Sequence, residues 1–110
     1  MQGWQHESVI ANLSDIANID AQRATWISGV GRPIPDPSEL GCQLFDDTDL
    51  GNMLSAGLVF SRECDQLLRR LGELFGASSL EGPLAAVLES AEWREIVALA
   101  RASLDGLNAL

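Results

Sequence analysis

The stretch LFDDTDL, residues 44–50, decides how this chain of 110 residues folds. Two large apolar residues, Leu44 and Phe45, stand directly before three carboxylates that fall within four positions. Asp and Thr at a helix start satisfy free backbone N–H groups and favour the helix dipole. The stretch therefore predicts a joint, where one short helix ends and the next begins, capped from Asp46 to Thr48 and reaching about residue 56.

Upstream of this joint, apolar residues recur at mostly helical spacing from about residue 6 to residue 28. We expect two helical pieces, divided at Asn18–Asp20 or, as an alternative, at Ser14-Asp15. Residues 29–37 hold two glycines and three prolines and are expected to form a stiff, extended linker, with a Pro-rich recognition segment as the alternative. Ser38 is the expected N-cap of the short helix that runs through Phe45.

Downstream, Ser61 opens the strongest amphipathic pattern, an apolar stripe made of Cys64, Leu67, Leu68, Leu71, Leu74 and Phe75. Asp65 falls on the opposite face, which we expect to meet solvent, and Gly76 should end the helix. A short helix is expected over residues 83–89. Ser90 should cap a last helix whose buried stripe begins at Trp93.

The remaining apolar triplet, Leu58-Val59-Phe60, is expected to enter the core as a short loop. No period of 20–50 residues repeats along the chain, so a solenoid array is excluded. The pattern as a whole predicts an all-α fold: a compact single-domain bundle of about five or six short helices over residues 1–110. A domain of this length buries enough surface to fold without a metal or a disulfide.

The charge of the chain limits its partners. The net charge is −9, with seven Arg and no Lys. Nucleic acids and anionic membranes both attract positive charge, so neither is an expected partner. No apolar run approaches the ~18 residues of a membrane span, and residues 1–7 lack the pattern of a secretory signal. We therefore expect a cytoplasmic protein whose partner, if it has one, is basic.

The sequence has few of the residue combinations that enzymes use for catalysis. The only histidine is His6, so a Cys/His or Ser/His nucleophilic set cannot be assembled. Cys42 and Cys64 show no metal-ligand spacing and are expected to be free, buried thiols, with a disulfide open only to a secreted protein. A calcium loop beginning at Asp47 would place Gly51 and Leu58 at positions that require other residues. We expect neither an enzyme nor a metal or cofactor site.

Acidic residues are most concentrated around the joint. From residue 33 to residue 60 the chain carries five acids and no base: Asp36, Glu39, Asp46, Asp47 and Asp49. These five are the candidate partner-binding residues. Helix capping or an ordinary solvated surface is the alternative interpretation of the same cluster.

Three segments together carry a resemblance: ANIDAQRATW at residues 17–26, LFDDTDL at 44–50 and the late Trp93. This pattern, ANxDxQRxxW … LFDDTxL … W, resembles that of small bacterial helical proteins of unassigned function. Some small acidic proteins of that general kind act as immunity proteins for secreted toxins. The resemblance implies a helical fold and an immunity-like role.

These observations predict a non-enzymatic protein-binding module, an immunity-type protein that covers a basic toxin or effector with its acidic face. The alternative is a structural or regulatory helical adaptor, or a homodimer that pairs through an apolar patch near residues 58–60. We expect a monomer or a weak homodimer.

Overall fold

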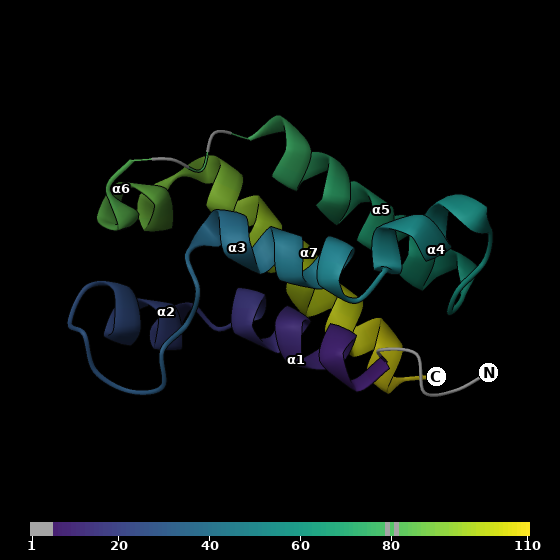
Figure 1. Ribbon diagram of the computed structural model, residues 1–110, viewed down its shortest axis with the longest axis horizontal. Coiled ribbons are helices and arrows are strands. Elements are labelled where there is room, and N and C mark those ends of the chain that lie inside the picture. The colour runs from purple at the N-terminus through teal and green to yellow at the C-terminus, as the bar shows by residue number, and fades with distance from the viewer. Residues whose placement is uncertain (1–5, 79, 81) are drawn as a thin grey trace.

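The computed structural model describes residues 6–78, 80 and 82–110, and over these residues the chain is an all-α bundle (Figure 1). It measures 40 × 27 × 23 Å. The described residues form seven α-helices and one π-helical turn, and no strand: α1 (His6–Ala17), α2 (Ile19–Trp26), α3 (Pro37–Cys42), η1 (Gln43–Asp47), α4 (Leu50–Ala56), α5 (Arg62–Ala77), α6 (Leu84–Glu89) and α7 (Ala91–Asn108). The expected all-α bundle is confirmed.

Helix α7 is the element around which the others pack. It lies against α1 along one side and against α5 along the other, while α3 crosses in front of it between the two (Figure 1). Its buried stripe comprises Trp93, Ile96, Val97, Ala100, Ser103 and Leu107. The predicted start of this stripe at Trp93 is confirmed, as are the N-caps Ser61 and Ser90, whose hydroxyls accept from the N–H groups of Cys64 and Trp93.

The joint between α1 and α2 falls at Asn18, as one of the two sequence alternatives predicts. The Asn18 side chain accepts from the backbone N–H of Ala21 at 3.0 Å and so caps α2. One turn into α2, the buried amide of Gln22 donates to the carbonyl oxygens of Asp15 and Ile16 at 2.7 and 2.8 Å. These two bonds satisfy carbonyls at the end of α1 that have no partner within the helix.

Trp93 links this joint to the rest of the core. Its ring is 0% exposed, and its indole N–H donates to the side-chain oxygen of Gln22 at 2.9 Å. Trp26 packs on one side of the ring and Phe75 on another, with centroids 5.8 and 6.1 Å away. Residues from α2, α5 and α7 therefore meet at a single indole.

The linker begins two residues earlier and ends one residue earlier than expected, and it is fastened at several points. It runs from residue 27 to residue 36, because Pro37 is the first residue of α3. The N-cap of α3 is therefore Asp36, whose carboxylate accepts from the N–H of Glu39 at 2.9 Å, and the prediction of Ser38 is wrong. Proline favours the first helical position because its missing N–H would be unpaired there anyway. Trp26 donates from its indole to the carbonyl of Ile34 at 2.9 Å, which ties the linker to the core.

Two further expectations fail around the start of α5. Leu58 is 69% exposed and does not enter the core, although Val59 and Phe60 pack against it in part. Asp65, expected to face solvent, is 0% exposed. Its carboxylate accepts from the N–H groups of Val59 and Phe60 at 2.7 and 3.0 Å, so the loop folds back over it. Helix α5 also runs one residue past Gly76, to Ala77.

Within the part of the chain that the structure describes, no helix combines the length and the apolar character needed to cross a membrane.

The role of Trp93 gives the first prediction. Trp93→Ala should lower the free energy of unfolding by about 3–5 kcal/mol, because it removes a fully buried ring and leaves a cavity. Trp93→Phe keeps a ring but leaves the Gln22 oxygen without its donor, and should cost about 1–3 kcal/mol. Urea denaturation followed by circular dichroism measures both values. Equal stability of Trp93→Ala and the parent chain would contradict the packing described above.

Candidate functional site

The five acidic residues predicted from the sequence lie on one continuous run of helix and on the turn that follows it. Helix α3 passes directly into η1, since Cys42 ends the first and precedes the second. All five side chains are exposed: Asp36, Glu39, Asp46, Asp47 and Asp49. Among the described residues, no Arg lies within ion-pair distance of any of these carboxylates. We refer to these five residues as the acidic run.

Capping explains only one member of the acidic run. Thr48, not an acid, holds the start of α4: its hydroxyl oxygen accepts from the N–H of Leu50 at 3.2 Å and donates to the carbonyl of Leu44. Thr48 is 2% exposed, so this pair of bonds is sheltered from water. Of the predicted cap, Asp46 to Thr48, only Thr48 bonds the start of α4, and the expectation for Asp46 and Asp47 is wrong. Asp36, which does cap α3, is the exception.

Asp49 occupies the N-cap position of α4 without a side-chain bond to the helix backbone. Its φ of 64° places it in the left-handed region, which Asp tolerates better than most residues. The carboxylate accepts instead from the side-chain amide of Asn52 at 2.7 Å. It therefore points along the surface and adds its charge to the acidic run.

The pKa of the Cys42 thiol is sensitive to the charges of the acidic run. It is exposed, contrary to the expectation that both cysteines are buried, while Cys64 is buried as expected and both are free. Partial removal from water raises the pKa of Cys42, and the nearby charges of four carboxylates raise that pKa further: Asp46, Glu39, Asp47 and Asp36, in decreasing order. Four of the five acids thus act on one point of the surface.

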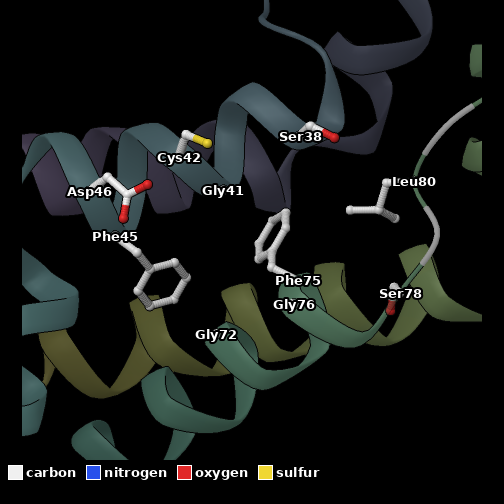
Figure 2. A pocket seen from close by; sticks show the side chains of 10 residues that line it. All are labelled: Ser38, Gly41, Cys42, Phe45, Asp46, Gly72, Phe75, Gly76, Ser78 and Leu80. Carbon is white, nitrogen blue, oxygen red and sulfur yellow. The ribbon is translucent and has the colours of Figure 1, made fainter.

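A groove of about 410 Å³ lies beside Cys42, between the α3–η1 run and the second half of α5 (Figure 2). One wall carries Ser38, Gly41, Cys42, Phe45 and Asp46, and the other carries Gly72, Phe75, Gly76, Ser78 and Leu80. Asp46 belongs both to the acidic run and to the wall of this groove. The negative charge of the acidic run and the apolar lining of the groove therefore meet at Asp46.

Two reciprocal contacts between glycine and phenylalanine shape the groove. Figure 2 shows Phe75 rising from α5 towards Gly41, and Phe45 descending towards Gly72. A Cβ atom on Gly41 would stand 2.7 Å from Phe75, and one on Gly72 would stand 3.4 Å from Phe45. The two rings meet edge to face with centroids 6.3 Å apart. Both rings stay half-buried, so each presents part of its surface to the groove.

Gly76 differs from these two glycines. Among the described residues, a Cβ atom built on it would meet nothing within 4 Å, although Gly76 lines the same groove. There is therefore open space beside Gly76 on this side of α5. These three glycines were not predicted to act as a set, although a glycine within a helical pattern is itself a signal of a packing or functional constraint.

No group of three or more His, Cys, Asp or Glu side chains is arranged to hold a metal ion in the described part of the chain. Asp46, Asp47 and Asp49 do not form such a group. The arrangement offers exposed negative charge, one poorly ionised thiol and two partly open aromatic rings, which together suit the binding of another molecule.

Comparisons of this chain with protein-family models, curated proteins and solved structures found no match.

The capping of α4 gives the second prediction. Thr48→Ala should lower the free energy of unfolding by about 1–2 kcal/mol, because Leu50 loses the acceptor of its N–H in a buried position. Asp46→Asn and Asp47→Asn should each change it by less than about 0.5 kcal/mol, since exposed carboxylates without partners contribute little. Guanidinium denaturation of the three variants tests this ranking, and a larger loss at either Asp would restore the capping interpretation.

The field around Cys42 gives the third prediction. Asp46→Asn removes the strongest of the charges that raise the pKa of Cys42, so the pKa should fall and the pH–rate profile of alkylation by iodoacetamide should move to lower pH. Below the pKa the variant should react faster, because the thiolate is the nucleophile. Asp105→Asn, an exposed acid that does not act on Cys42, serves as the control. Identical profiles for all three proteins would contradict the described geometry.

Proposed function

We propose that this protein is a non-enzymatic binding module that docks a basic partner protein on its acidic run, in the manner of an immunity protein that covers a toxin or effector. The observation that carries the proposal is the set of five exposed carboxylates that have no ion-pair partner among the described residues. Such a surface attracts positive charge over a distance and orients a basic partner before contact.

The rigidity of the acidic run supports the same proposal. Four of its members stand on or at the ends of the α3–η1 helical run, whose Leu40 and Leu44 are fully buried. Charges on a fixed backbone lose little conformational freedom when a partner arrives, so less of the binding energy is lost to ordering. The proposal includes a cytoplasmic location, in which the two free cysteines stay reduced.

A homodimer or helical adaptor is the second candidate function. It is favoured by one observation, the 69% exposure of Leu58 in the loop before α5. Sedimentation of the parent chain and of Leu58→Ser separates the two candidates. A dimer that the Leu58→Ser variant loses would support the adaptor, whereas a monomer in both cases would remove it.

The fourth prediction concerns the acidic run itself. The acidic-run variant replaces the five carboxylates of the acidic run with amides: Asp36→Asn, Glu39→Gln, Asp46→Asn, Asp47→Asn and Asp49→Asn. Asn remains a good N-cap at position 36, so the fold should persist. The probe is protamine, a small basic protein rich in Arg. We expect the variant to associate with it about tenfold more slowly, or slower still, at low salt. The difference should shrink at high salt, because exposed charges are screened there.

A control with equal net charge makes this experiment specific. It replaces five other exposed acids: Glu7→Gln, Asp20→Asn, Glu63→Gln, Glu92→Gln and Asp105→Asn. If only total charge mattered, both variants would slow association equally. Association rates measured by surface plasmon resonance against ionic strength distinguish the two cases. Equal rates for the parent and the acidic-run variant would overturn the proposed function.

A further inference from the structure

The groove beside the acidic run has apolar surface that the fold does not cover. Phe45 and Phe75 are only half-buried, and both rings pack against the described core with part of their surface. Leu80 closes one end of the groove, and the absent side chain of Gly76 leaves its α5 wall open. In protein interfaces, most of the binding energy comes from a few side chains that fill such pockets, surrounded by groups that exclude water.

The charge around the groove restricts what can enter it. Asp46 stands on its wall, and Glu39, Asp47 and Asp36 lie near enough to act on the neighbouring Cys42 thiol. An anionic guest would be repelled by all four carboxylates, which excludes acidic peptides, nucleic acids and anionic lipid surfaces. An apolar side chain with positive charge on either side of it satisfies both the rings and the carboxylates.

We propose that the groove between α3–η1 and α5 receives one apolar anchor side chain, aromatic or large aliphatic, from a basic segment of a partner protein in which Arg or Lys flanks the anchor. The groove is continuous with the acidic run through Asp46, so this proposal rests on the proposed function and names the chemistry that the partner presents. The anchor lies on Phe45 and Phe75, and the flanking cations pair with Asp46 and its neighbours.

Gly76 provides a way to close the groove without disturbing the fold. Among the described residues, a Cβ atom at this position meets nothing within 4 Å, and Gly76 adopts ordinary helical backbone within α5. Gly76→Leu should therefore fill the groove and leave the melting temperature unchanged or slightly higher. Ala77→Leu is the matched control, since Ala77 is exposed on the same turn but does not line the groove. Ser38→Leu fills the groove from the opposite wall and guards against an unexpected loss of fold in Gly76→Leu.

The fifth prediction uses two synthetic blocked peptides, one with a single Phe between two pairs of Arg and one with Ala in place of the Phe. Titration into isotope-labelled protein, followed through the amide signals of Gly41, Gly72 and Gly76, gives both dissociation constants. We expect the parent chain to bind the Phe peptide about tenfold more tightly than the Ala peptide, because a buried ring strengthens binding by that order. Gly76→Leu and Ser38→Leu should abolish this ratio, and Ala77→Leu should preserve it.

The outcomes separate the two proposals. Equal affinity of the parent for both peptides would overturn the anchor groove. Both peptides could still bind equally well to the parent and lose affinity at high salt or when the acidic-run variant replaces the parent. In that case the proposed function would stand, although the anchor groove would not. If neither peptide bound at millimolar concentration, the anchor groove would fail, and the association experiment with the basic protein would decide the proposed function by itself. If Gly76→Leu and Ser38→Leu still bound the Phe peptide more tightly than the Ala peptide, the anchor would lie outside the groove. That result would overturn the assignment of the anchor to the groove. Dimerisation that Gly76→Leu abolishes would assign the groove to a second copy instead.

Discussion

The hydrogen bond between the Trp93 indole and the Gln22 amide is the contact on which the arrangement of this bundle depends. Both groups are buried, and a buried polar group without a partner is costly, so each specifies the position of the other. Gln22 also donates to the last carbonyls of α1. Three helices, α1, α2 and α7, are thereby fixed in one register, which apolar packing alone would specify less strictly.

The consequences of this bond reach the candidate site through the aromatic rings. Trp93 supports Phe75, Phe75 lies against the bare backbone of Gly41, and that contact sets how closely α3 approaches α5. The depth of the groove and the position of Asp46 on its wall both follow from this spacing. The core and the surface that we propose as the binding site are therefore joined by direct contacts rather than by a flexible connection.

Six of the seven arginines have partners away from the acidic run and so give it no counter-charge. Four of them form ion pairs elsewhere: Arg23 and Arg94 with Glu89, Arg32 with Asp15, and Arg70 with Glu73 and Glu95. Arg69 and Arg101 donate to backbone carbonyls, at Leu54 and Ala17. The exposed pairs contribute little stability individually. These pairs neutralise acids away from the acidic run and leave the charges of the run itself uncompensated.

Local sequence patterns predicted the elements well and their contacts poorly. The stripe after Ser61, the cap at Ser90 and the joint at Asn18 depend on neighbouring residues, so spacing and capping chemistry were sufficient. The cap of α3 was misassigned because Pro37 was treated as linker, whereas proline at the first helical position points to Asp36. The burial of Asp65 was beyond reach, since its partners are the N–H groups of a loop whose path no local pattern describes. The charge distribution along the sequence singled out the five acids of the candidate site, all of which are exposed, and their role in binding stays a prediction. The groove beside them was missed, because Gly41 meets Phe75 and Phe45 meets Gly72 only after folding.

The three glycines of the groove separate what the fold requires from what it merely permits. Gly41 must lack a side chain, because a Cβ atom there would stand 2.7 Å from Phe75, whereas a Cβ atom on Gly72 would meet Phe45 at 3.4 Å, an ordinary contact. Gly76 meets no such constraint among the described residues, and it stands one residue before the end of α5, where glycine is common. Packing therefore accounts for Gly41 and gives no reason for Gly72 or Gly76. Glycine at position 76 leaves open space on the α5 wall of the groove, opposite the wall that carries Asp46 (Figure 2).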